Sequence, residues 1–263
     1  MDPTAISPPG RPRVCAVSFL NTVPLIWGLL HGEQQGRFDL SLAIPAECAE
    51  RLAGGRADIG IVPAVELLHQ KLEIIRGTGI ASYGAVRSIL LVTKVPPARI
   101  RTLAADSSSR TSVMLSRILL HRLHGAHPEY RSRPPRLRAM LAECDAALLI
   151  GDPALRIDPA LLEYECLDLG QIWTEMTGLP MVFAVWAGHP EFVNAETERL
   201  FLDSYRFGMA NLDDIIQQHV LPRGLPAELG REYLTRHILL ELGPREYKGL
   251  DLYLNYASQH RSA

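Results

Sequence analysis

The sequence lacks the features that mark zinc proteins, dithiol redox proteins and membrane proteins. It contains four cysteines, and no two of them form the C-x-x-C pair that zinc and dithiol motifs need. No apolar run is long enough to span a membrane. The proline-rich first dozen residues also lack the apolar core of a secretory signal. We therefore expect a cytoplasmic protein with no membrane partner. The cysteines are interpreted as small buried side chains in a reducing compartment: Cys15, Cys48, Cys144 and Cys166.

The sequence also has little excess charge and few catalytic motifs. A net charge of −2, with 47% hydrophobic and 21% charged residues, is typical of an ordinary soluble protein. Nothing resembles a basic footprint for nucleic acid. We interpret the arginine-rich stretch 131–138 as a solvated connector, with RNA binding as a distant alternative. No H-E-x-x-H, G-x-S-x-G or P-loop occurs, and the nine histidines show no ligand spacing, so we expect neither a metal nor a cofactor.

What the sequence does contain is a regular alternation of strand-like and helix-like segments. Apolar runs of four to seven residues predict strands, and helical spacing of apolar residues predicts the segments between them. The expected strands are 14–17, 38–43, 57–62, 88–93, 102–105, 145–150, 166–169 and 181–187. The expected helices are 24–30, 46–53, 64–70, 111–123, 137–143 and 172–177, and residues 190–257 are mostly helical. The alternation predicts an α/β protein with mixed sheets flanked by helices.

The two most apolar of the expected strands, 88–93 and 181–187, lie on either side of a middle unit, which indicates two lobes. We expect an outer lobe formed by residues 13–94 and 187–263 and an inserted inner lobe formed by 95–186, after a flexible segment at 1–12. Ligands of α/β units bind beyond the carboxyl ends of the strands. The cleft between the two lobes is therefore the expected ligand site.

Small polar residues follow several of the expected strands. Ser18, Asn21 and Thr22 follow the first strand, and Pro24 then opens a helix. The stretch 107–112 consists of five hydroxyl side chains and one arginine before a long helix. Free N–H groups, hydroxyls and the helix dipole converge at such a point, which suits a carboxylate or phosphate. The alternative is a serine-rich N-cap without a ligand.

Carboxylates near strand ends are the candidate bases. Glu66 and Asp152 are the two examples, although single carboxylates are more often caps or ion-pair partners. Asp152 stands between Gly151 and Pro153, so an N-cap role explains it equally well. We expect the aromatic residues at element ends to pack in the core rather than to line the site: Trp27, Tyr83, Trp173 and Trp186.

Six motifs, taken in order, resemble one family. They are SFLNTVPL at 18–25, ADIGIVPAVEL at 57–67, SILLVTK at 88–94, SSRTS at 108–112, GDPAL at 151–155 and WTEMTGLPMVFAVW at 173–186. Their order and spacing are similar to the chorismate dehydratases of the futalosine route to menaquinone, cytoplasmic enzymes with the type 2 periplasmic-binding-protein fold. The sister cyclase of that route carries His-Glu-Gly where this chain has Ile150-Gly151-Asp152. That difference favours the dehydratase.

The resemblance implies loss of water from chorismate to give 3-[(1-carboxyvinyl)oxy]benzoate, with aromatisation as the driving force and no cofactor. It implies that Asn21 is the catalytic residue and holds the enolpyruvyl ether or its carboxylate, while Asp152 contacts the leaving hydroxyl. We expect the substrate's own enolpyruvyl carboxylate to act as the base, with Asp152 and Glu66 as alternatives. The expected substrate-binding residues are Ser18, Ser88, Ser108, Ser109, Thr111, Ser112, Gly151 and Asp152.

The sequence leaves other functions open. A solute-binding protein for small carboxylates, the related dehypoxanthine futalosine cyclase and the ligand-sensing domain of a transcriptional regulator would share the fold. The missing secretory signal argues against an exported binding protein. The short N-terminal segment leaves no room for a helix-turn-helix unit. A monomer and a homodimer are equally compatible with the sequence.

Overall fold

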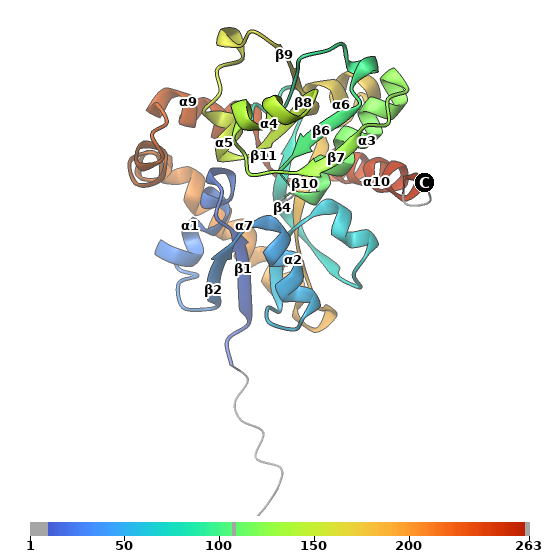
Figure 1. Cartoon of the computed structure of the whole chain (residues 1–263). Helices are drawn as coiled ribbons and strands as arrows, with labels where there is room; N and C mark the ends of the chain where they lie inside the picture. Colours follow the sequence, from blue (N-terminus) through green and yellow to red (C-terminus); the bar gives the residue numbers. More distant parts are fainter. Residues whose placement is uncertain (1–9, 107–108, 261–263) are drawn as a thin grey trace, which may run out of the picture.

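Two β-sheets, one above the other in Figure 1, organise the chain. The structure, a computed structural model, describes residues 10–106 and 109–260. Ser108 and residues 1–9 of the expected flexible segment therefore lie outside the described residues. The first sheet has six strands in the order β11-β4-β10-β3-β1-β2, and the second has five in the order β7-β6-β8-β5-β9. Each sheet contains both parallel and antiparallel pairs, as expected for mixed sheets.

The strand bounds follow the apolar runs closely. The first sheet, with the elements packed on it, forms the first lobe, and the second sheet forms the second lobe. Strands of the first sheet are β1 (Arg13–Val17), β2 (Asp39–Ala43), β3 (Ile59–Pro63), β4 (Glu73–Ser82), β10 (Met181–Gly188) and β11 (Leu239–Glu241). Strands of the second sheet are β5 (Ile89–Thr93), β6 (Thr102–Ala105), β7 (Glu129–Ser132), β8 (Ala146–Ile150) and β9 (Glu165–Asp168). Every residue of β3, β5 and β8 is buried, because helices or the other lobe cover both faces of these strands.

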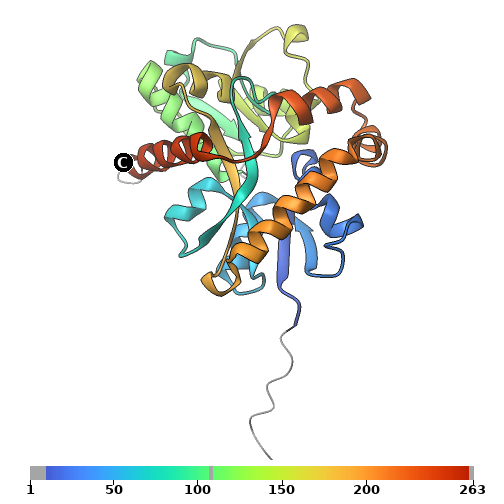
Figure 2. The ribbon, with the colours of Figure 1, turned by 180° about the vertical axis from the view of Figure 1, so that it is seen from behind.

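Helices cover the sheets and connect the lobes. The α-helices are α1 (Val23–His31), α2 (Pro45–Ala53), α3 (Arg110–His124), α4 (Leu137–Glu143), α5 (Asp152–Leu155), α6 (Leu169–Thr177), α7 (Ala195–Ala210), α8 (Leu212–Ile215), α9 (Ala227–Glu232) and α10 (Pro244–Gln259). Helix α2 packs on β1 and β3, and α7 packs on α1 and β4, where it runs diagonally across the near side of the first lobe in Figure 2. Helix α10 contacts β10 in the first lobe and α3 in the second.

The expected lobe boundaries differ from the observed strand pairing. Boundaries at residues 94 and 187 would place β5 in the outer lobe and most of β10 in the inner lobe. Instead β5 pairs with β8 and β9 in the second sheet, and β10 pairs with β3 and β4 in the first. The chain therefore crosses between the sheets before each of these strands, at residues 83–88 and 178–180. Apolar character identifies a buried strand but not the sheet to which it belongs.

Other segments also differ from their expected form. Residues 129–132, within and beside the expected arginine-rich connector, form the edge strand β7, parallel to β6. Residues 64–70, expected as an α-helix, contain a 3-10 turn at Ala64–Leu68. Within the expected C-terminal helical region, α9 continues into a π-helical turn at Tyr233–His237 and then into β11.

Parallel pairing brings several polar chain segments to one place. β1 pairs in parallel with β2 and β3, and β6 pairs in parallel with β8. Parallel strands end at the same edge of their sheet, so the residues that follow them gather there. Residues after β1 and β2 and the last residue of β3 meet residues after β6 and β8 across a cavity between the lobes.

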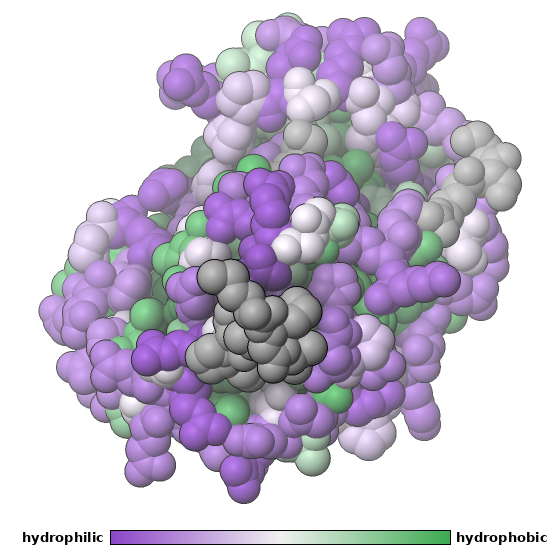
Figure 3. All heavy atoms as spheres, turned by 90° about the horizontal axis from the view of Figure 1, so that it is seen from below, coloured by the Kyte–Doolittle hydropathy of each residue, from purple (hydrophilic) through white to green (hydrophobic). Residues whose placement is uncertain are grey.

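The core and the surface are ordinary for an α/β protein. Trp27, Trp173 and Trp186 are buried in the core, as expected, whereas Tyr83 is half exposed under Arg245. The face seen from below is largely hydrophilic, with apolar residues scattered among polar ones (Figure 3). Within residues 10–106 and 109–260, none of the helices combines the length and the apolar character that crossing a membrane requires.

We expect Gly208→Ala to lower the free energy of unfolding by about 1–3 kcal/mol. A Cβ at Gly208 on α7 would lie 2.2 Å from the carbonyl oxygen of Pro24 on α1, so α1 and α7 would have to move apart. Urea denaturation measures the change. Arg206→Ala, at an exposed position of the same helix, should stay within about 0.5 kcal/mol of the unmodified protein. A stabilised Gly208→Ala variant, as expected for a helix surface without this contact, would contradict the prediction.

Candidate active site

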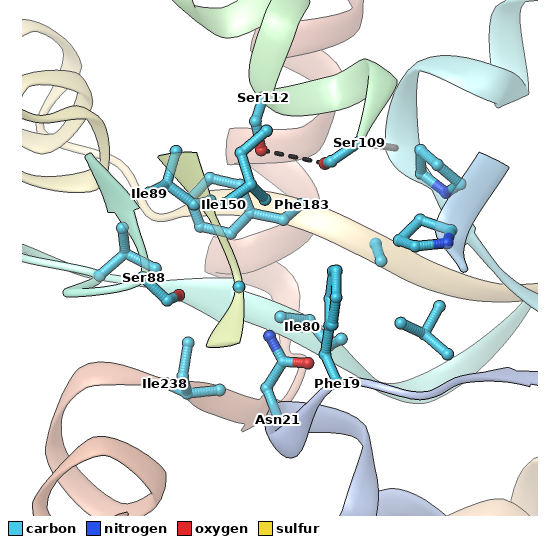
Figure 4. A pocket seen from close by; sticks show the side chains of 16 residues that line it. Phe19, Asn21, Ile80, Ser88, Ile89, Ser109, Ser112, Ile150, Phe183 and Ile238 are labelled. Atoms are coloured by element: carbon cyan, nitrogen blue, oxygen red, sulfur yellow. Dashed lines mark hydrogen bonds between the residues drawn. The ribbon is translucent and has the colours of Figure 1, made fainter. Parts of the chain in front are cut away.

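A cavity of about 40 Å³ lies between the two lobes (Figure 4). Its apolar walls include Phe19, Ile80 and Phe183 from the first lobe and Ile89 and Ile150 from the second. Its polar lining residues are Asn21, Ser88, Ser109 and Ser112. Among the residues that the structure describes, no charged side chain lines the cavity. Ligand pockets usually enclose about 300–1,000 Å³, so a substrate enters only when the lobes open or their side chains move apart.

Asn21 and Ser88 are joined through a third side chain. Asn21 lies in a 3-10 turn, Leu20–Thr22, directly after β1, and Ser88 directly precedes β5. The Asn21 Nδ2 donates to the Tyr233 hydroxyl at 3.1 Å, and that hydroxyl donates to Ser88 Oγ at 2.9 Å. All three side chains are at least nine-tenths buried. Burial raises the pKa of Tyr233, which therefore stays protonated at neutral pH.

The start of α3 forms the opposite polar wall. Ser109 occupies the N-cap position, but its side chain makes no capping bond. Its Oγ lies 3.1 Å from Ser112 Oγ, as drawn in Figure 4. The first N–H groups of a helix have no partner within the helix, and the helix dipole adds a partial positive charge there. This wall can therefore accept a carboxylate without a cationic side chain.

Asp152 connects the two lobes instead of lining the cavity. It is the first residue of α5, and its Oδ1 accepts from the backbone N–H of Leu20 at 3.0 Å. Its Oδ2 accepts from Arg223 Nε at 2.9 Å, and Arg223 Nη2 also donates to the Ser18 carbonyl at 3.1 Å. The expected N-cap role is wrong, because Gly151 holds that position and Asp152 makes no capping bond. The expected contact with a leaving hydroxyl stays a prediction, although both oxygens already have partners.

Gly151 allows the two lobes to approach each other closely. Its φ is +70° and its ψ is −143°, a combination that residues with a Cβ strongly disfavour. A Cβ here would also lie 2.9 Å from the ring of Phe19 in the first lobe. Glycine at this strand end thus lets the Phe19 ring lie against the backbone of the second lobe.

Three other predicted residues do not line the cavity. Ser18 is exposed and contributes its carbonyl to Arg223. Thr111 is fully buried, and its Oγ1 accepts from the backbone N–H of Val65 at 3.2 Å. The buried Glu66 carboxylate accepts from Arg110 at 2.9 Å, a contact between the lobes. Ser88, Ser109, Ser112, Gly151 and Asn21 are the predicted residues that the cavity brings together.

Sequence reasoning missed Phe19, Phe183, Tyr233 and Arg223. Phe19 lies inside the first polar motif and Phe183 inside the last apolar strand, so an aromatic residue in either motif was the available signal. Tyr233 and Arg223 come from the C-terminal third of the chain, Tyr233 in a segment that looks like ordinary helix and Arg223 in the proline- and glycine-rich break at 222–226. Nothing in the local pattern there points toward Asn21, Ser88 or Asp152, which lie more than 70 positions earlier in the chain.

A comparison with family models covers nearly the whole chain. The model described as "Menaquinone biosynthesis" matches residues 12–259. The chain belongs to this family. A curated relative, the chorismate dehydratase of Thermus thermophilus, is 31% identical in an alignment 212 residues long that covers 73% of this chain and 77% of the relative. The resemblance predicted from the six motifs is thereby confirmed.

The fold of this member of the menaquinone biosynthesis family is similar to that of periplasmic binding proteins of known structure. A protein of Archaeoglobus fulgidus has a TM-score of 0.76 at 19% identity, over 96% of this chain and 98% of its own. The periplasmic aliphatic sulphonate binding protein SsuA of Escherichia coli has a TM-score of 0.64 at 16% identity, over 97% of this chain and 89% of its own. At such identities the similarity establishes the fold alone, and it confirms the expected two-lobed binding-protein fold.

We expect Gly151→Ala to destabilise the protein by about 1–3 kcal/mol more than Gly178→Ala, because it adds overpacking against Phe19 and a φ/ψ combination that alanine adopts less readily than the αL conformation of Gly178. Gly178 has a φ of +69°, but no atom lies within 4 Å of the point that a Cβ would occupy there, so it reports the cost of positive φ without a contact. Urea denaturation of both variants gives the difference. The substitution Phe19→Ala should be less destabilising in the Gly151→Ala background than in the Gly178→Ala background, because it removes the overpacking only in the former. Equal losses in the two single variants would contradict the prediction, and an equal effect of Phe19→Ala in both backgrounds would show that the Phe19 contact is not the cause.

Proposed function

We propose that this protein is a chorismate dehydratase. It eliminates water from chorismate to give 3-[(1-carboxyvinyl)oxy]benzoate, acting in the cytoplasm in the futalosine route to menaquinone, as a monomer or homodimer and without a cofactor. Family membership and the name of the Thermus thermophilus relative support this assignment. The observation that carries it is the cavity, which offers hydroxyls, one amide and a helix N-terminus but no charged lining side chain among the described residues.

Such a cavity suits a reaction in which the protein supplies position rather than a strong acid or base. Chorismate loses a ring proton and its allylic hydroxyl, which leave together as water, and the ring becomes aromatic. The wall formed by Ser109, Ser112 and the first turn of α3 binds one carboxylate. Asn21 then holds the enolpyruvyl ether or its carboxylate. Orientation of this kind can lower the activation free energy substantially.

The base in this proposal is the substrate's own enolpyruvyl carboxylate. Glu66 does not line the cavity and accepts from Arg110, and both oxygens of Asp152 have partners in the closed lobes. The substrate carboxylate, in contrast, lies within the same molecule as the proton that it removes. Solvent exclusion by the closed lobes would keep this proton transfer internal.

The first test is product formation from chorismate by the purified protein. We expect an aromatic product that lacks one molecule of water relative to chorismate, detected by ultraviolet absorbance and by mass. Binding of chorismate without conversion would contradict the assignment and favour a carboxylate-binding protein. Conversion of dehypoxanthine futalosine instead would identify the related cyclase.

A second prediction concerns Asn21 and the two candidate carboxylate bases. We expect Asn21→Ala to lower kcat by about 10²-fold or more, because a positioned polar group at the reacting centre is lost. Asp152→Asn and Glu66→Gln should lower kcat less than about tenfold, because each weakens one hydrogen-bonded contact and removes no reacting group. Steady-state kinetics and calorimetric binding of chorismate measure these effects. If either carboxylate variant bound chorismate normally but lost all turnover, the substrate would not be its own base.

A further inference from the structure

The Tyr233 hydroxyl lies between the two polar residues that line the same side of the cavity. It accepts from Asn21 Nδ2 at 3.1 Å and donates to Ser88 Oγ at 2.9 Å. Asn21 belongs to the first lobe, and Ser88 stands at the crossover into the second. One hydroxyl therefore connects a residue of the first lobe with the point at which the chain enters the second.

Tyr233 acts from behind the cavity wall. Its side chain is 1% exposed and does not line the cavity. It begins the π-helical turn Tyr233–His237, a backbone form that often marks functional sites. The turn is fixed at its other end, where His237 Nδ1 lies 2.9 Å from the Ala85 carbonyl and Ile238 reaches the cavity. Figure 4 shows Ile238 beside Asn21 and Ser88.

The direction of the hydrogen bonds decides which atoms face a ligand. A phenol has one proton, and Tyr233 gives it to Ser88, so Tyr233 must accept from the amide of Asn21. The Nδ2 of Asn21 is thus held toward Tyr233, and its Oδ1 is held toward the opposite side, 3.4 Å from the Thr22 hydroxyl. Ser88 Oγ accepts the hydrogen bond from Tyr233, so the Ser88 hydroxyl proton remains available to another acceptor. Without the phenol, the Asn21 amide could rotate by 180° at little cost.

We propose that Tyr233 is a positioning residue, which fixes the orientation of the Asn21 amide and of the Ser88 hydroxyl for the dehydration. This inference rests on the proposed function. It assigns the C-terminal segment a role in the site, although that segment contributes no polar side chain to the cavity lining. The phenol remains neutral because burial raises its pKa, so the hydrogen-bond directions persist across the neutral pH range.

The test compares Tyr233→Phe with the matched variant Tyr253→Phe. Tyr253 is also fully buried, and its hydroxyl donates to the Thr111 carbonyl at 3.1 Å in the first turn of α3, so it contacts neither Asn21 nor Ser88. We expect Tyr233→Phe to lower kcat by about 10- to 100-fold, because a small misplacement of reacting groups is enough for that loss. Binding of chorismate should change less than about threefold, since the carboxylate wall at α3 is untouched. Tyr253→Phe should lose a similar amount of stability but keep kcat within about threefold, because Asn21 and Ser88 keep their partners, and any effect should fall on binding of chorismate at the start of α3.

A double-mutant cycle separates positioning from a structural effect. In a Ser88→Ala background, the further loss of kcat caused by Tyr233→Phe should be smaller than in the unmodified protein, because part of its action has been removed. The double variant no longer contains the serine hydroxyl that would lose its donor, although Asn21 Nδ2 still loses its acceptor. If Tyr233→Phe alone folds poorly, the loss of kcat in the double variant relative to Ser88→Ala still measures the effect of Tyr233 on Asn21. Tyr253→Phe should have the same small effect in both backgrounds.

The outcomes distinguish this inference from the proposed function. An active unmodified protein with normal kcat in Tyr233→Phe would overturn the role of Tyr233 and leave the dehydratase intact. Equal loss of kcat in Tyr233→Phe and Tyr253→Phe, or full additivity with Ser88→Ala, would likewise overturn it. An unmodified protein that makes no product would overturn the dehydratase, and the role of Tyr233 with it.

Discussion

The contact on which the site depends is the one between Asp152 and the first lobe. Its carboxylate accepts from the Leu20 N–H and from Arg223, so the second lobe holds the backbone immediately before Asn21. The same contact requires Gly151, whose missing Cβ leaves room for Phe19. Because these groups come from opposite lobes, the cavity exists in this form only while the lobes are closed. Closure thus encloses the cavity and fixes Asn21 at the same time.

The proposed substrate is a dianion, yet no charged side chain among the residues that the structure describes lines the cavity. The proposed base gives a physical reason for this arrangement. Partially buried cations near the substrate would stabilise its carboxylates strongly, but they would also lower the basicity of the carboxylate proposed as the base. Hydroxyls and helix N–H groups bind a carboxylate with less effect of that kind. Two ion pairs lie nearby, Arg223 with Asp152 and Arg110 with Glu66. In each pair the two charges neutralise each other, and the pair joins the lobes.

The fixed orientations of the Asn21 amide and the Ser88 hydroxyl matter because the cavity lining offers only neutral groups. A neutral amide and a hydroxyl are weak catalytic groups unless their direction is fixed, and water would compete for them in an open site. The buried phenol of Tyr233 supplies that direction from a part of the chain that contributes only Ile238 to the cavity lining. The C-terminal segment therefore supports the site as well as the fold.

Much of this arrangement is visible in the sequence, and the remainder has clear physical reasons for being hidden. Local apolar patterns predict β6 and α4 with the observed bounds, and the motif order predicts the family. Pattern does not tell which face of a helix start meets a ligand, so it groups Thr111 with Ser109 and Ser112 although Thr111 faces Val65. Strand pairing is equally non-local, which is why apolar character alone places β5 and β10 in the wrong lobes. Tyr233 depends on a contact across 145 positions, with Ser88, that no local pattern encodes.

The most direct test is a crystal structure of Asn21→Ala with chorismate bound. The account predicts closed lobes, with one carboxylate within hydrogen-bond distance of Ser109, Ser112 or the first N–H groups of α3. It also predicts that no arginine or lysine side chain contacts the substrate. A carboxylate paired with a guanidinium or ammonium group, or chorismate bound outside the cavity between the lobes, would contradict it.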